Sequence, residues 1–315
     1  MSILLKTLEV HEISSKVGVE RYKHHLNMVD PENPYYKYEL LNVDYQKNNN
    51  LMYFVFFVEN SPKVLMPFYL NPIITKGRKT TYKDVSSPWG YTGPLLEKNC
   101  KVDILRDFWK EVDDWYMAEN IISEFIRFNF SGNHRNYSGK VVHTLSNVRG
   151  NILDEQVLWN NFNRSVRKNY NNAQKYDLEF QLWHDEIQST QIEEFYSIYI
   201  GTMDRHDAKD NFYHTLEYFS NFILKNKGRC SLAIVYLGEI AVSTELVLLS
   251  NDTMYSFLGG TNSEYFHVRP NDFLKINMLN WARKKGLKYY IIGGGLSDGD
   301  SLYKYKKSFF QKMRI

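Results

Sequence analysis

The order of elements in the last third of the chain constrains the fold more than any other feature of the sequence. Two apolar runs flank a turn at residues 251–252, a polar loop follows, and the sequence PND at 270–272 opens an amphipathic stretch. That stretch stops at Gly286, a residue type that commonly ends helices. A second apolar run, KYYII at 288–292, leads into three glycines and a short basic segment. This order predicts strand, strand, helix, strand and a closing helix.

The start of the helix at Pro270 is a candidate anion-binding site. Proline at the first turn of a helix costs nothing, because its missing N–H would be unpaired there in any case. The free N–H groups of a first turn point outward and attract negative charge. We therefore predict that Asn271, which lies in this turn, contacts substrate.

Length and charge limit the possible classes of protein. With 315 residues, the chain has room for one large domain or two of average size. A net charge of +3, from 39 basic and 36 acidic residues, argues against a dedicated nucleic-acid coat. Neither Cys100 nor Cys230 has metal or redox spacing, which indicates a reducing compartment. No apolar run is long enough for a signal peptide or a membrane span, so we expect a cytoplasmic protein.

The first half is predicted to contain a buried hairpin, a loop, a helix and further strands. Apolar runs at 51–60 and 61–70 form the hairpin, and the proline- and glycine-containing segment 77–96 is predicted to be an irregular loop. Trp89 and Tyr91 in this loop either fill their own core or form the wall of a ligand cleft.

Two strands are predicted at the end of this half. The strand at 121–130 carries Arg127, whose charge either pairs within the fold or binds an anion. Another strand is predicted at 140–148, and we place the domain boundary near residue 148.

The second half is predicted to open with a basic helix at 153–176, followed by a strand and two helices at 189–206 and 211–228. A hairpin then turns at residues 238–239. Each half therefore shows a hairpin, an excursion, a helix and a strand, which predicts a duplicated architecture.

Motifs of several common enzyme classes are missing. The glycines at 293–295 lack the G-x-G-x-x-G spacing of a dinucleotide site, and no Walker A, H-E-x-x-H or G-x-S-x-G sequence occurs. The nine histidines form no pair with ligand spacing. Both cysteines lie at or beside apolar runs, which disfavours a thiol nucleophile.

Six segments in order carry a family resemblance. They are SSPWGYTGP (86–94), EFIRFNF (124–130), RSVRKNYNNAQKYDLEF (164–180), FYSIYIGTMDRHDA (195–208), FLGGTNSEYFHVRPNDFL (257–274) and IIGGGLSDGDSLYKYKKSF (291–309). On these segments the chain resembles the FemAB-like branch of the GNAT acyltransferase fold. That branch includes FemX-type peptidoglycan bridge enzymes and relatives from bacterial surface-polysaccharide gene clusters.

The resemblance implies an α/β fold of two tandem GNAT-like domains, at 1–148 and 149–315, with a substrate cleft between them. It implies transfer of an acyl or aminoacyl group to an amine by direct attack, without a metal. In FemX-type enzymes the donor is an aminoacyl-tRNA, and the acceptor is a nucleotide- or lipid-linked cell-wall precursor.

The resemblance also assigns residues. The family's lysine at the donor's phosphate or reaction centre falls on Lys306, beside Tyr305. The arginine that contacts the acceptor diphosphate falls on Arg205, with Tyr213 nearby. The matched segments also contain two further candidate substrate-binding residues, Arg167 and Gly259.

The identity of the donor stays open at this point. The helical arm that some FemAB proteins use around tRNA has no counterpart, and EYFHVRPN stands where CoA-dependent GNAT enzymes have Q/R-x-x-G-x-G/A. We therefore expect acyl-CoA or aminoacyl-tRNA as the co-substrate and no tightly bound cofactor.

A mechanism follows as a hypothesis. Glu245, Asp298 or Asp300 would take the proton of the attacking amine, directly or through water. Lys306 would offset the negative charge that develops on the carbonyl oxygen or the leaving group.

Three functions remain as alternatives. The first is an acyl- or aminoacyltransferase that acts on an amino sugar or peptide of an envelope precursor, in the cytoplasm or at the inner face of the membrane. The second is a protein of the same fold that binds the precursor without catalysis, and the third is an RNA-binding module that uses the 164–175 helix. The acyl group, the acceptor and the oligomeric state are not determined by the sequence.

Overall fold

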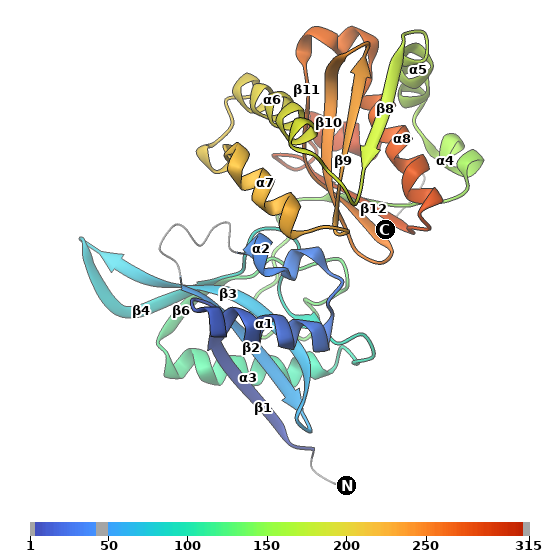
Figure 1. Cartoon of the computed structure of the whole chain (residues 1–315). Helices are drawn as coiled ribbons and strands as arrows, with labels where there is room; N and C mark the ends of the chain where they lie inside the picture. The colour runs from blue at the N-terminus through green and yellow to red at the C-terminus, as the bar shows by residue number, and fades with distance from the viewer. Residues whose placement is uncertain (1–3, 42–49, 311–315) are drawn as a thin grey trace. The chain divides into compact units, whose positions relative to one another are not determined.

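The computed structural model describes residues 4–41 and 50–310, and the chain folds into two compact units, Met1–Val142 and His143–Ile315 (Figure 1). Each unit is built on one sheet that contains both antiparallel and parallel strand pairs. The predicted α/β class and the duplicated architecture are confirmed. Among the described residues, no helix is both long and apolar enough to cross a membrane.

Unit 1 has the sheet order β1-β2-β3-β4-β6, with the short strand β5 paired to β3. In chain order its main elements are β1 (Lys6–Glu12), α1 (Lys16–Val29), α2 (Tyr38–Leu41), β2 (Asn50–Val58), β3 (Ser61–Thr75), β4 (Arg78–Ser86), β5 (Leu95–Leu96), α3 (Ile104–Ala118) and β6 (Ile121–Phe125). The predicted hairpin is β2–β3, and it turns through Glu59 and Asn60, which both have positive φ. Phe54, Phe68 and Phe108 lie in the core between this sheet and α3.

Two predictions for unit 1 were wrong. The segment 77–96 is not a loop throughout, because its first part forms strand β4, which pairs with β3. The strand predicted at 121–130 ends at Phe125, and the backbone that follows is irregular.

Unit 2 has the sheet order β7-β12-β11-β10-β9-β8. Its elements are β7 (Asn147–Asn151), α4 (Glu155–Asn161), α5 (Arg164–Ala173), β8 (Leu178–Trp183), α6 (Ser189–Arg205), α7 (Leu216–Lys225), β9 (Cys230–Leu237), β10 (Ile240–Leu249), β11 (Thr253–Thr261), the 3₁₀ helix η4 (Ser263–Val268), α8 (Pro270–Lys284), β12 (Tyr289–Gly294) and α9 (Ser301–Lys307). The strand, strand, helix, strand, helix order predicted for the last third is confirmed.

The start of unit 2 differs from the prediction. Residues 140–146 are irregular, and the strand there begins only at Asn147. The helix predicted at 153–176 is broken into α4 and α5, because the side chain of Asn163 caps a new helix start by accepting from the backbone N–H of Ser165. The guanidinium of Arg167 donates to the carbonyl of Phe162 at 2.6 Å and to that of Trp159 at 3.1 Å, and so satisfies the end of α4.

The sheet of unit 2 has helices on both faces (Figure 1). Helices α6 and α7 cover one face, while α8 packs on the other face with α5 beside it. Strands β11 and β12 run parallel but pair only from Thr253↔Tyr289 to Tyr255↔Ile291. Beyond these residues the two strands share no ladder, so their C-terminal ends open next to α8 and α9.

Candidate functional site

Lys306 lies where β11 and β12 part. Its ammonium nitrogen donates to the carbonyl oxygen of Gly294, the last residue of β12, at 2.7 Å. The pKa of Lys306 is lowered to about 8, first by burial and then by the positive charge of Lys275, while Glu245 and Asp300 act in the opposite direction. A lysine with this pKa can gain or lose a proton close to neutral pH.

A buried charge network lies at the same place in the sheet. Lys275 of α8 donates to Glu245 of β10 at 2.6 Å and to the hydroxyl of Tyr290 on β12 at 3.1 Å. Tyr290 donates to the other oxygen of Glu245 at 2.8 Å, and the hydroxyl of Ser256 on β11 donates to that same oxygen. Glu245 is 2% exposed and Lys275 is 7% exposed. Four elements therefore meet through one ion pair whose polar atoms are satisfied by protein.

The register of the sheet makes this network possible. Between β10 and β11 the register shifts at Leu246/Val247, so that Val247 pairs with Ser256 while Leu246 pairs with Leu258. Such a bulge changes which side chains face the interior. Gly259 pairs directly with Glu245, and a Cβ there would lie 2.5 Å from the carbonyl oxygen of Thr244. The predicted binding residue Gly259 thus allows a close approach of two strands.

The start of α8 is acidic. Asp272, in its first turn, is 6% exposed, accepts from the side-chain amide of Asn169 at 3.3 Å, and has its pKa raised to about 6 by burial. Pro270 has no N–H, and the N–H of Phe273 is bonded to the carbonyl of Arg269 at 3.3 Å. The first turn around the predicted contact residue Asn271 therefore has one N–H donor fewer for an anion, because of Pro270.

Asp300 organises the turn before α9. Its carboxylate accepts from the backbone N–H groups of Tyr303, Leu296 and Ser297 at 2.7, 2.7 and 3.1 Å. These bonds, that of Tyr303 first, lower the pKa of the carboxyl. A Cβ at Gly295 would come 2.0 Å from this carboxylate, which explains the glycine. Asp298 accepts from the N–H of Ser146 at 3.3 Å.

Tyr305 points inward beside the network. Its hydroxyl is buried and has no hydrogen-bond partner among residues 4–41 and 50–310. Burial raises the pKa of this phenol, with smaller contributions from Asp272 and Glu245. Its ring packs edge-on against Phe309 at 5.4 Å, so Tyr305 joins α9 to the core of unit 2.

Arg205, the last residue of α6, is held at the end of β11. It donates to the carbonyl oxygen of Thr261 at 2.8 Å, and its guanidinium lies 5.1 Å from the ring centroid of Phe266. Burial lowers the pKa of Arg205. Tyr213 lies farther along the chain, and its pKa is raised first by desolvation and then by Asp204, Asp207 and Asp210. Arg167 donates to carbonyl oxygens at the end of α4.

The three remaining predicted residues belong to unit 1. Trp89 is exposed, whereas the ring of Tyr91 packs against Tyr35 at 5.2 Å and Phe130 at 4.8 Å. Arg127 donates to the carbonyl oxygen of Ser87 at 2.8 Å. Its guanidinium also lies 4.7 Å from the ring centroid of Phe125.

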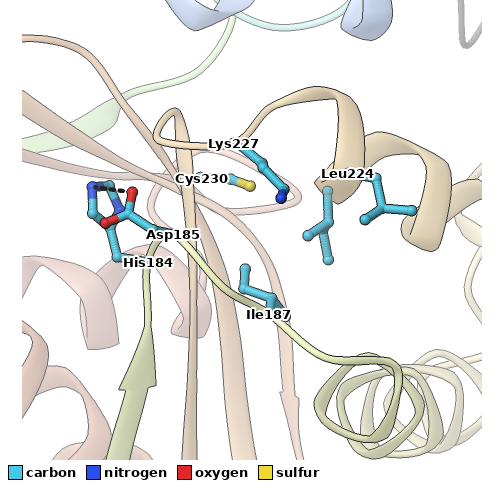
Figure 2. A pocket seen from close by; sticks show the side chains of 7 residues that line it. His184, Asp185, Ile187, Leu224, Lys227 and Cys230 are labelled. Carbon is cyan, nitrogen blue, oxygen red and sulfur yellow. Dashed lines mark ion pairs between the residues drawn. The ribbon is translucent and has the colours of Figure 1, made fainter.

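A surface pocket of about 210 Å³ lies elsewhere in unit 2, between β9 and the end of α7 (Figure 2). Its lining includes His184, Asp185, Lys227 and Cys230. Cys230 pairs with Leu248 near the end of β10, and Leu249 pairs with Met254 near the start of β11. The pocket therefore lies by the N-terminal end of β11, whereas Lys306 lies toward the C-terminal ends of β11 and β12. The pocket is smaller than most ligand sites, and burial raises the pKa of the Cys230 thiol to about 12. This pocket therefore lacks the nucleophile and the volume of an active site.

Sequence reasoning missed Lys275, Tyr290, Ser256 and Asp272. One signal was present: Lys275 lies directly between Leu274 and Ile276, within the apolar stretch of α8. A lysine at a buried helix position needs a partner, but the sequence does not say that the partner is Glu245, 30 residues earlier. Among the described residues, no three His, Cys, Asp or Glu side chains are grouped as metal ligands would be.

Comparison with known protein families gives one match within unit 2. Residues 160–307 match the family model described as an acetyltransferase (GNAT) domain. No curated protein matches the chain by sequence. The matched residues lie within unit 2, from the end of α4 to the residue after Lys306.

Solved structures extend the likeness to both units. FemX has a TM-score of 0.69 at 13% identity, over 96% of this chain and 94% of FemX. L-PGS from Bacillus licheniformis has a TM-score of 0.57 at 11% identity, over 92% of this chain and 87% of that one. The C-terminal domain of a putative lysylphosphatidylglycerol synthetase from Agrobacterium fabrum has a TM-score of 0.55 at 11% identity, over 93% and 81%. The predicted likeness to the FemAB-like GNAT fold is confirmed at the level of the fold.

Proposed function

We propose that this chain, whose second unit matches a GNAT family model, transfers an acyl or aminoacyl group to an amine of a cell-envelope precursor. The observation that carries the proposal is the position of Lys306: it lies at the opening between β11 and β12, where burial lowers its pKa to about 8. The structural likeness to FemX and to the putative lysylphosphatidylglycerol synthetase supports a precursor that bears a peptide, a sugar or a lipid.

In the proposed step, Lys306 carries the proton. The neutral acceptor amine attacks the carbonyl carbon of the donor, so that a C–N bond forms and the bond to the leaving oxygen or sulfur breaks. Lys306 takes the proton from the amine and gives it to the leaving atom, so no other reactant is needed. Glu245 and Asp300 are poorly suited as the base, because their carboxylate oxygens already accept the bonds described above. In this proposal they position α8 and α9, and Tyr305 anchors Lys306 to the core.

For the donor, we favour an aminoacyl-tRNA. The first turn of α8 is where a GNAT enzyme that uses acyl-CoA needs N–H donors for the pyrophosphate. Here Pro270 lacks the donor, and the buried carboxyl of Asp272 places negative charge in the same turn. Acyl-CoA is the second candidate, because the family model that matches unit 2 is an acetyltransferase model. Both donors belong in the cytoplasm, where we place the reaction.

For the acceptor, we propose a nucleotide- or lipid-linked amino sugar or peptide, with Arg205 near its diphosphate. The guanidinium is fixed by Thr261 and Phe266, which limits the entropy lost on binding. Trp89, Tyr91 and Arg127 stay candidate substrate contacts of unit 1, since binding residues are frequent on loops of a rigid scaffold.

The test uses Lys306→Met, with Lys304→Met on the same short helix as its control. Lys304 is exposed, so its replacement changes the charge of α9 equally. Transfer would be measured with labelled aminoacyl-tRNA or acetyl-CoA as donor and UDP-linked amino sugars as acceptor. We expect Lys306→Met to lower kcat by about a hundredfold or more, as for loss of a proton carrier, and Lys304→Met to stay close to wild type.

The pH profile sharpens this test. If Lys306 must be neutral to take a proton, kcat/KM rises with pH through about 8, the pKa of Lys306. A rate that falls through the same pH would mean that Lys306 acts as a cation. Full activity of Lys306→Met with every donor would refute its role, and a chain that binds the UDP-sugar but transfers from no donor would be a binding protein.

A further inference from the structure

Strands β3 and β4 continue beyond the sheet of unit 1 as a two-stranded ribbon (Figure 1). Within the described residues, pairing of β3 with β2 ends at Leu70, and pairing of β4 with β6 begins at Lys83. Inside the segment 71–82, Ile74 pairs with Lys79 and Thr75 with Arg78, around a turn at Lys76-Gly77 in which both residues have positive φ. We call this segment the ribbon. Most of its residues are exposed, so its sequence is not explained by the core.

The ribbon concentrates positive charge. Lys76, Arg78 and Lys79 are exposed, residues 71–82 contain no aspartate or glutamate, and no ion pair joins these three cations to an acidic group in the described part of the chain. The whole chain carries only +3, so the rest of it sums to zero. By contrast, Lys83 at the base of the ribbon is paired with Glu119 at 2.6 Å.

Apolar side chains accompany this charge on the flanks of the ribbon. Tyr82 is 49% exposed and Ile74 is 59% exposed. Because side chains alternate along a strand, Arg78 and Lys79 lie on opposite faces of the ribbon, and Ile74 shares the face of its partner Lys79. Cations on both faces and an exposed aromatic ring suit a partner that surrounds the ribbon with phosphates and offers bases for stacking.

We propose that the ribbon binds the RNA of the charged donor, and this inference rests on the proposed function with an aminoacyl-tRNA donor. Lys76, Arg78 and Lys79 would contact phosphates, and Tyr82 would stack on an unpaired base. A membrane surface suits the ribbon less well. A membrane is flat and would meet one face of the ribbon, whereas here Arg78 and Lys79 lie on opposite faces.

A simpler explanation is that the charges only protect the exposed strand edges. Lys and Arg on edge strands commonly prevent pairing with other chains. That role needs no stacking by Tyr82 and no affinity for RNA, so the two explanations predict different results.

The experiment compares two triple variants of the full chain that lose the same charge. The test variant is Lys76→Gln, Arg78→Gln and Lys79→Gln, and the control is Lys284→Gln, Lys285→Gln and Lys288→Gln at exposed positions of unit 2. Binding of fluorescein-labelled uncharged tRNA would be followed by anisotropy at several salt concentrations. We expect the test variant to bind about tenfold more weakly, with a salt slope smaller by about 2 for three lost contacts. The control should match wild type, and Tyr82→Ala should weaken binding about fivefold.

Several outcomes would overturn the inference. These are equal losses in the two triple variants, no tRNA binding by wild type, and unchanged tRNA binding together with lost binding to vesicles of phosphatidylcholine and phosphatidylglycerol. Transfer kinetics separate this inference from the proposed function. If charged tRNA is a donor but the test variant keeps the wild-type KM for it, the ribbon inference alone fails. If uncharged tRNA binds through the ribbon but no aminoacyl group is transferred, the proposed function alone fails.

Discussion

The two units share the order strand, two helices, three antiparallel strands, helix and strand, apart from the short β5 of unit 1, but their parallel strand pairs differ. In unit 1, β4 and β6 stay paired up to Ser86↔Phe125, at the C-terminal ends of both strands. In unit 2, β11 and β12 part after Tyr255↔Ile291, and β11 continues for another six residues to Thr261. The C-terminal ends of parallel strands are the usual place for ligands in α/β proteins. Only in unit 2 does this edge of the parallel pair open.

The two units also differ in which residues their long helices bury. Helix α3 of unit 1 buries Leu105, Phe108 and Trp109 against its sheet. Helix α8 of unit 2 has the same length but buries Lys275 and Asp272 as well as apolar residues. An interior built only on burial of apolar area has no reason to include these charges. We therefore propose that unit 2 is the half that carries the chemistry.

The largest expected effect is on the free energy of unfolding. It tests whether the buried Lys275–Glu245 pair of unit 2 stabilises the fold more than the half-exposed Lys83–Glu119 pair of unit 1. Lys275→Met leaves Glu245 buried without its cation, which should lower the free energy of unfolding by about 3–5 kcal/mol. Lys83→Met, which breaks the half-exposed Lys83–Glu119 pair, should cost about 1 kcal/mol or less. Urea unfolding of both variants gives the comparison.

The double variant Glu245→Gln with Lys275→Met serves as the control for this prediction. It removes both charges, so it should be more stable than Lys275→Met alone. Equal losses of unfolding free energy in Lys275→Met and Lys83→Met would contradict a larger contribution from the buried ion pair of unit 2.

The next effect concerns pH. Burial raises the pKa of Asp272 to about 6, above its value in the unfolded chain. A raised carboxyl pKa means that the folded state binds the proton more tightly, so this stabilisation is present at low pH and is lost as pH rises through about 6. Asp272→Asn stays neutral at every pH. Its free energy of unfolding, relative to that of wild type, should rise by on the order of 2 kcal/mol between pH 4.5 and pH 8.

Urea unfolding at a series of pH values measures this gain. Glu124→Gln in unit 1 is the comparison, because burial also raises the pKa of Glu124, which accepts from Tyr116 at 2.7 Å and Tyr137 at 2.5 Å. Since Glu124 is less buried than Asp272, we expect the same direction and a smaller change. A difference between Asp272→Asn and wild type that does not vary with pH would contradict this account.

The smallest effect concerns how each unit packs its first long helix. In unit 2, α6 approaches β11 so closely that a Cβ at Gly260 would lie 2.3 Å from the hydroxyl of Thr202. In unit 1, the corresponding helix α1 packs through Tyr22, whose ring lies 5.0 Å from that of Tyr53. Gly260→Ala should therefore destabilise the chain by about 1–3 kcal/mol.

Gly201→Ala is the matched control for Gly260→Ala. Gly201 is an exposed residue of α6 with open space at its Cβ position, so alanine there should stabilise by about 0.5–1 kcal/mol. Thermal melts of both variants measure these shifts. Opposite signs are expected, and a stabilising Gly260→Ala would show that α6 can move away from β11.

Local patterning determined a large part of this protein. The two hairpins, the start of α8 at Pro270 and its end before Gly286 were all predictable, because turn residues, caps and helical periodicity act over a few neighbours. The role of Asp300 was also available, since an aspartate three residues before Tyr303 is a local helix cap. Asp300 was instead proposed as a candidate base, but its bonds to backbone N–H groups support the role of a helix cap.

Tertiary structure decided the rest. Strand β4 carries no alternating apolar pattern at its start, because the ribbon leaves the core and both of its faces are exposed, so pattern reasoning interpreted it as a loop. The partners of Lys275 lie 30 and 15 residues away, and only the packing of α8 on β10 and β12 brings them together. Burial of Lys306 in the packed unit also lowers its pKa. A sequence specifies which side chains exist, but desolvation and long-range contacts exist only once the sheet and helices have packed.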